Sequence, residues 1–157
     1  MKIDLWWIGK TKPAYLEEGI QDYAGRIKHY INFSCLTIPD IKNQASMNPG
    51  ILKKKEAEWV INRLQPDDFL ILLDENGKTF DSVSFAGFVE ELMVRSVKQV
   101  VFLIGGAYGF DESLYTRANE KISLSRMTFS HQMVRLFFTE QLYRAFTIIH
   151  HEKYHNL

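Results

Sequence analysis

Four short segments of the chain are almost continuously apolar, and longer stretches with helical periodicity lie between them. The apolar segments are residues 3–8, 33–38, 69–73 (FLILL) and 100–104 (VVFLI). A short run without polar alternation is typical of a strand that is buried on both faces of a parallel sheet. The stretches between them predict helices over residues 14–29, 46–64 and 82–94. The alternation predicts an α/β fold with a mostly parallel sheet sandwiched by helices.

The longest predicted helix covers residues 130–151. Apolar side chains recur there at steps of three and four residues and form one stripe, and Ser130 is placed to cap its start. Such a stripe can pack on the sheet of its own chain or on a second copy, and the sequence leaves both open. Glu140 and Arg144 lie at i, i+4 spacing, which favours a weak helix salt bridge.

Length and composition favour one soluble globular domain over residues 1–157. The chain has 157 residues, of which 46% are apolar and 24% charged. A lone cysteine, Cys35, excludes an internal disulfide and a multi-cysteine zinc site. The start of the chain lacks a signal-peptide pattern, and no apolar run approaches the ~20 residues that cross a bilayer. We therefore expect a cytoplasmic protein with no membrane segment and no metal.

The charges balance overall, with 19 basic and 19 acidic residues, but they are unevenly distributed. Residues 121–157 carry five cations and two anions, so this quarter is positive and the rest of the chain is negative. The prediction is that any anion is recognised in the C-terminal quarter. Arg135, Arg144 and Lys153 are candidates for contacts with phosphates.

Two adjacent glycines follow the apolar segment 100–104, in the sequence Leu103 to Gly109 (LIGGAYG). Ligands of open α/β sheets bind beyond the carboxyl ends of the strands, where glycine allows the main chain to approach closely. The pattern differs from the dinucleotide fingerprint G-x-G-x-x-G, which argues against NAD. A ligand site and a plain tight turn both remain open.

Two other motifs invite a chemical interpretation. Residues 76–79 (NGKT) match only half of a phosphate-binding loop, because position 72 is leucine, and they predict a turn. Residues 151–155 (HEKYH) formally match the zinc-protease motif H-E-x-x-H, but almost no chain follows that could supply a third ligand. We interpret Lys153, Tyr154 and His155 instead as a tail that is suited to stacking on a nucleotide and gripping it.

The segment of residues 122–131 (ISLSRMTFSH) combines small hydroxyl residues with Leu124, Met127 and Phe129. These apolar side chains predict a buried loop. A buried loop needs partners for its amides and carbonyls, and a ligand can supply some of them.

Three blocks together resemble a known family: LIGGAYGF (103–110), LSRMTFSHQMVRLFFTEQLYRAF (124–146) and KYH (153–155). They are similar in order and spacing to the bacterial SPOUT-class methyltransferases that modify N3 of a pseudouridine in large-subunit (23S) ribosomal RNA. The resemblance implies a C-terminal trefoil knot, S-adenosylmethionine as the methyl donor, and a homodimer. It implies cofactor contacts at Leu73, Gly105, Gly106, Leu124, Ser125, Arg126, Met127, Thr128 and Phe129.

For catalysis, the candidates are His155, Tyr154, Arg144 and His131. A histidine can accept the proton of the ring nitrogen, Arg144 can hold phosphate, and we expect Tyr154 and His155 to position the base. Because a protein of zero net charge binds free RNA weakly, we expect it to act on the ribosomal RNA within the assembled ribosome. The rival hypothesis is a non-catalytic ribosome-binding or RNA-binding factor on the same fold.

Overall fold

The computed structural model describes residues 1–156 and contains one five-stranded sheet, in the order β2-β1-β4-β3-β5. All neighbouring strands run parallel, which confirms the predicted α/β class. The strands are β1 (Lys2–Ile8), β2 (Asn32–Ile38), β3 (Phe69–Thr79), β4 (Gln99–Ile104) and β5 (Glu120–Ser123). Short, half-polar β5 was not predicted, because only two of its residues are buried.

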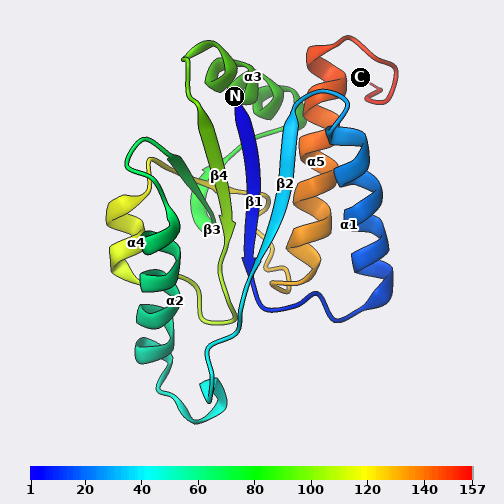
Figure 1. Cartoon of the computed structure of the whole chain (residues 1–157). Helices are drawn as coiled ribbons and strands as arrows, with labels where there is room; N and C mark the ends of the chain where they lie inside the picture. The colour runs from blue at the N-terminus through cyan, green and yellow to red at the C-terminus, as the bar shows by residue number, and fades with distance from the viewer. Residues whose placement is uncertain (157) are drawn as a thin grey trace.

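Helices cover both faces of the sheet (Figure 1). Those of the first face are α1 (Ala14–Ile27), α3 (Ser82–Val94) and α5 (Met133–Ile149), and those of the second are α2 (Pro49–Arg63) and α4 (Glu112–Arg117). A short 3-10 helix, Gln44–Ser46, precedes α2. Helix α2 starts three residues later than predicted, because Pro49 occupies its first turn and the Asn48 side chain accepts a hydrogen bond from the Gly50 amide at 2.8 Å.

The core follows the alternation of side chains along the central strands. In β1, Leu5 and Trp7 face the helices of the first layer, while Trp6 and Ile8 face the second. Every residue from Ile3 to Ile8 is therefore buried. This explains why the strand is apolar on both faces apart from Asp4, which is also buried.

Helix α5 packs on the sheet of its own chain. Its side chains Phe138, Leu142 and Phe146 are fully buried, and the Phe138 ring lies 4.7 Å from that of Phe102 in β4. Most of the apolar stripe of α5 is thus buried within its own chain, although Phe137 stays 41% exposed. The Ser130 hydroxyl accepts a hydrogen bond from the Met133 amide at 3.1 Å, as expected of a residue at the helix start.

The turn predicted over residues 76–79 is wrong, because this segment is part of β3. Leu73 and Lys78 both pair with Ile122 of β5, so the residues between them form a bulge. A Cβ atom on Gly77 would lie only 2.5 Å from the Ile122 carbonyl carbon. The glycine is thus required by the close approach of two strands.

No helix within residues 1–156 is long and apolar enough to span a bilayer. The trefoil knot that the resemblance implies stays a prediction. The fold places the carboxyl ends of β3, β4 and β5 and the start of α5 around one region, where the candidate site lies.

Candidate active site

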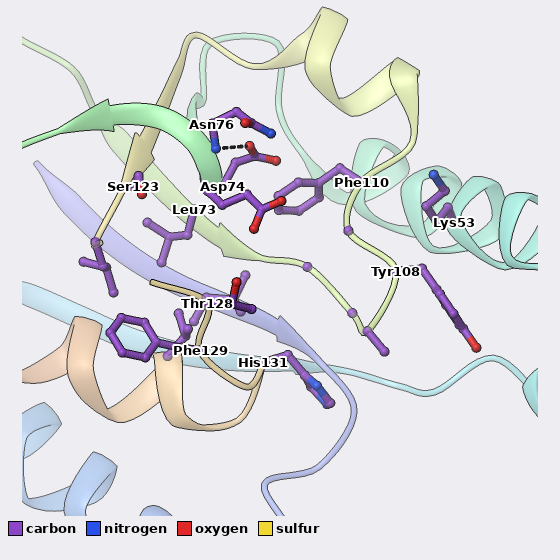
Figure 2. Close-up of a pocket in the computed structure, with 18 of the residues that line it drawn as sticks. Lys53, Leu73, Asp74, Asn76, Tyr108, Phe110, Ser123, Thr128, Phe129 and His131 are labelled. Atoms are coloured by element: carbon purple, nitrogen blue, oxygen red, sulfur yellow. Dashed lines mark hydrogen bonds between the residues drawn. The ribbon is translucent and has the colours of Figure 1, made fainter. Parts of the chain in front are cut away.

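A cavity of about 910 Å³ opens beyond the carboxyl ends of β3 and β4 (Figure 2). Its volume is within the range of small-molecule sites, and its position is where open parallel sheets bind ligands. Eight of the nine residues predicted to contact a cofactor line it: Leu73, Gly105, Gly106, Leu124, Ser125, Met127, Thr128 and Phe129. Arg126 does not, although it lies in the same segment.

The glycine turn after β4, residues 105–109, presents bare main chain to the cavity. A Cβ atom on Gly105 would lie 3.1 Å from the Phe110 ring, and one on Gly106 would lie 3.2 Å from the Glu56 carboxylate. The Gly109 amide donates to the Gly106 carbonyl at 3.2 Å, and Gly109 has a φ of +78°. Side chains at Gly105 and Gly106 would crowd the Phe110 ring and the Glu56 carboxylate, so these two positions favour glycine.

The segment of residues 122–131 forms the facing wall, and its hydroxyls shape it. The Ser123 hydroxyl donates to the Ser125 carbonyl at 2.8 Å, and the Ser125 hydroxyl accepts from the Met127 amide at 3.0 Å. The prediction of a buried loop is wrong in part, because Met127 is 75% exposed. Leu124 and Phe129 are half-buried, so only the two ends of the segment pack against the core.

The acidic wall of the cavity was missed from the sequence. Asp74 follows the buried part of β3 and accepts hydrogen bonds from the Tyr115 hydroxyl and the Asn76 amide. Burial, and then this hydrogen bond, raise the pKa of Tyr115. Asp111 caps α4 by accepting from the Ser113 amide and hydroxyl, which lowers its pKa. The sequence did contain a signal for this acidic wall. The acidic pair directly after FLILL falls at the carboxyl edge of a strand, where ligands bind.

His131 is half-buried and lines the cavity where α5 begins (Figure 2). Burial is the largest cause that lowers its pKa, followed by the positive charges of Arg135 and Lys12. The imidazole is therefore neutral near neutral pH. In that form its ring nitrogen can accept a proton.

Arg135 is fully buried, so the expectation that it binds phosphate is wrong. Its guanidinium donates to the carbonyls of Ile8 at 2.7 Å and Gly9 at 3.1 Å, and to the Thr11 hydroxyl at 2.9 Å. Burial lowers the pKa of this side chain to about 10. The hydrogen bonds of Arg135 thus connect α5 to the end of β1 and stabilise the structure behind the cavity.

Arg144, Tyr154 and His155 gather around Glu140 in what we call the tail cluster. Arg144 donates to Glu140 at 2.5 Å, and the Tyr154 hydroxyl donates to the same carboxylate at 3.0 Å. Nη1 of Arg144 lies 3.2 Å from Nδ1 of His155, and its guanidinium lies 4.8 Å from the centre of the Tyr154 ring. The salt bridge expected between Glu140 and Arg144 is thus present.

The tail cluster does not reach the cavity of its own chain. None of its residues lines the cavity, and His131 and Arg144 are separated by roughly 20 Å at ~1.5 Å per helical residue. Figure 1 shows the C-terminal end of α5 and the tail at the top of the sheet, while β1 and β4 point downward. Of the four predicted catalytic residues, the structure brings only His131 to the cavity.

The structure offers no support for the zinc motif. Helix α5 ends at Ile149, and His151 has a left-handed backbone with a φ of +57°, so residues 151–155 lack the helical spacing that the motif requires. No group of three or more potential metal ligands occurs within residues 1–156.

Comparisons with known proteins agree with this geometry. The family model described as "Predicted SPOUT methyltransferase" matches residues 1–155. Three bacterial relatives bear the name ribosomal RNA large subunit methyltransferase H. They come from Parabacteroides distasonis (51% identity), Cytophaga hutchinsonii (53%) and Flavobacterium johnsoniae (53%), and each alignment covers at least 99% of both chains.

A parallel α/β sheet with a cavity at its carboxyl edge is characteristic of the class of α/β proteins that bind small molecules at their strand ends. Within that class, the match over almost the whole length places the chain plainly: it belongs to the SPOUT methyltransferase family.

Proposed function

We propose that the protein transfers a methyl group from S-adenosylmethionine to N3 of a pseudouridine in large-subunit (23S) ribosomal RNA. The observation that carries this is the cavity walled by Gly105, Gly106 and residues 124–129, in a chain that belongs to a methyltransferase family. The names of the relatives, which specify large-subunit ribosomal RNA, support the substrate. The chain acts as one domain over residues 1–157, in the cytoplasm, where ribosomes are made.

The cavity fits such a donor in shape and chemistry. Leu73, Leu124 and Phe129 supply apolar walls for an adenine ring, and the main chain around Gly106 offers polar groups for its edge. The carboxylates of Asp74 and Asp111 lie on one wall, where they attract the positive charges of the donor. Arg126 does not line this cavity, so we assign it a contact through its main chain only.

S-adenosylmethionine supplies an electrophilic methyl group on a sulfonium. When bound, it would give up this methyl group with the electron pair of the carbon–sulfur bond staying on sulfur, and the accepting nitrogen would have to lose its proton. His131, neutral and within the cavity, is the group we assign to accept that proton. Holding the two reactants in line is the main task of the remaining residues.

We propose that the protein works as a homodimer, because the tail cluster is too far from the cavity of its own chain. A second copy can bring its Tyr154, His155 and Arg144 to that cavity, where the first two would position the base and the third would hold a phosphate. Exposed apolar side chains support this pairing. Met127 (75% exposed) and Phe137 (41% exposed) lie near Phe129, which borders both this cavity and a second one of about 420 Å³.

The zero net charge of the chain supports the assembled ribosome as the substrate. Contacts with phosphates supply most non-specific affinity for RNA, and a neutral protein has few to offer. Shape recognition on a folded ribosomal surface can compensate for this deficit.

Transfer of a labelled methyl group tests the function. Ribosomes that lack the modification are incubated with the protein and labelled S-adenosylmethionine, and the labelled nucleotide is mapped. We expect one labelled position, at N3 of a pseudouridine, and faster labelling of ribosomes than of protein-free RNA. Absence of any transfer, with no affinity for the donor in a calorimetric titration, would favour the rival RNA-binding factor.

A further inference from the structure

Two exposed lysines from the loop between β1 and α1 lie beside the cavity. The Lys12 amide donates to the Gln132 side chain at 2.8 Å, and the Gln132 amide group donates to the Lys10 carbonyl at 3.5 Å. Gln132 follows His131, which lines the cavity, and the charge of Lys12 acts on that imidazole. The contacts of their main chain with Gln132 thus place both lysines near the cavity, and both residues are exposed.

A third lysine and an exposed aromatic ring continue this edge. Lys53 of α2 lines the cavity, and so does Tyr108 at the tip of the glycine turn. Tyr108 is 58% exposed, and Figure 2 shows its ring extending away from the cavity on the side where Lys53 lies. Its hydroxyl makes no hydrogen bond within residues 1–156, so the ring is not used to stabilise the turn. An exposed aromatic beside cations is a typical stacking platform for a nucleic acid base.

The cavity also has acidic residues in its lining. Asp74, Glu75 and Glu112 are among them, and their charges repel phosphate. Two further carboxylates, Asp111 and Asp40, partly offset the positive charges of the lysines. The charge of Lys53 acts on Asp111, and the charge of Asp40 acts on His131. The surroundings of the cavity therefore carry both signs of charge, and a phosphate is attracted only close to the lysines.

We infer that Lys10, Lys12, Lys53 and Tyr108 form a docking surface for the RNA strand that carries the target base. This inference rests on the proposed function and specifies how its substrate is held. The lysines contact phosphates, and Tyr108 stacks on a base next to the target, which can then enter the cavity. Phosphate recognition thus involves the N-terminal part of the chain as well as the C-terminal quarter that the charge distribution indicated.

Two variants test the surface. Lys10→Gln with Lys12→Gln removes two charges but keeps the main-chain contacts with Gln132, and Tyr108→Ala removes the ring. Binding to purified ribosomes is measured without the methyl donor, together with kcat/KM for methyl transfer and the affinity for S-adenosylhomocysteine.

For the double lysine variant we expect weaker ribosome binding and a shallower salt dependence. Two lost contacts reduce the slope of log K against log salt by about 1.4, so from 50 to 200 mM salt the wild type should lose about sevenfold more affinity than the variant. For Tyr108→Ala we expect binding to weaken about fivefold or more, while Tyr108→Phe keeps the ring and stays close to the wild type. Affinity for S-adenosylhomocysteine should not change in the double lysine variant, because neither lysine lines the cavity.

The matched control is Lys28→Gln with Lys98→Gln, two exposed lysines at the opposite edge of the sheet. If Lys10→Gln with Lys12→Gln behaves like this control, or Tyr108→Phe binds as weakly as Tyr108→Ala, the surface is refuted. If the wild type binds ribosomes but transfers no methyl group, the proposed function fails while the binding comparison still decides the surface.

Discussion

Glu56 gives the most quantitative prediction. It lies on α2 behind the glycine turn, is 5% exposed, and its carboxylate faces Gly106. Burial, and to a smaller extent the charge of Asp40, raise the pKa of Glu56 from 4.5 to about 7. Within residues 1–156 no hydrogen bond compensates its ionised form, so ionisation of this group should cost stability.

The direction in which pH changes the free energy of unfolding follows from proton linkage. Between pH 4.5 and about 7 the unfolded chain loses the Glu56 proton while the folded chain keeps it, so the free energy of unfolding falls across this window. Above the pKa of the folded state, the free energy of unfolding is lower by about 3 kcal/mol at most. Glu56→Gln cannot ionise, so it should be more stable than the wild type at pH 8 by up to about 3 kcal/mol and nearly equal at pH 4.

Urea unfolding at a series of pH values, followed by tryptophan fluorescence, measures this difference. Glu58→Gln is the matched control, because Glu58 lies on the same helix but is exposed. It should change the free energy of unfolding little at any pH. A Glu56→Gln difference that is the same at pH 4 and pH 8 would refute the reasoning, since only a group that titrates between those values can make it pH-dependent.

Three further variants probe the site and its support. Gly106→Leu should stay folded but lose at least about 100-fold in affinity for S-adenosylhomocysteine by calorimetry, because its side chain must occupy the cavity or displace Glu56; unchanged affinity would place the cofactor elsewhere. Arg135→Met should lower the free energy of unfolding by about 2 to 4 kcal/mol, since two buried carbonyls lose their donor; equal stability in urea would contradict this. Tyr154→Phe should lower kcat by about tenfold while cofactor affinity is kept, because the hydrogen bonds of its hydroxyl with Glu140 and Tyr23 are lost; a wild-type kcat would remove the Tyr154 hydroxyl from the mechanism.

The sequence predicts the elements of the fold well where burial is complete. Segments such as FLILL and VVFLI are continuously apolar and short, and both features together favour a covered parallel strand over a buried helix. The prediction of strands and turns fails where the local sequence pattern is ambiguous. Asn76 and Gly77 favour a turn, but the actual requirement is room for Ile122 of a neighbouring strand, which is set by tertiary contact.

The candidate site was predictable in part. Adjacent glycines after a buried strand indicate a place where main chain is exposed, and the resemblance supplied the facing segment. Arg135 shows the limit of reasoning from charge, because a cation counted as free for phosphate is buried and donates to Ile8 and Gly9. The position of the tail could not be predicted either, since its contacts with Glu140 depend on how far α5 carries it from the cavity.

The most direct test of the account is a crystal structure of the protein with S-adenosylhomocysteine. We predict that the ligand lies in the cavity at the carboxyl ends of β3 and β4, with its adenine ring between Gly106 and residues 124–129. A ligand bound at any other place, or a cavity that stays empty at saturating concentration, would contradict the assignment of this cavity as the methyl-donor site.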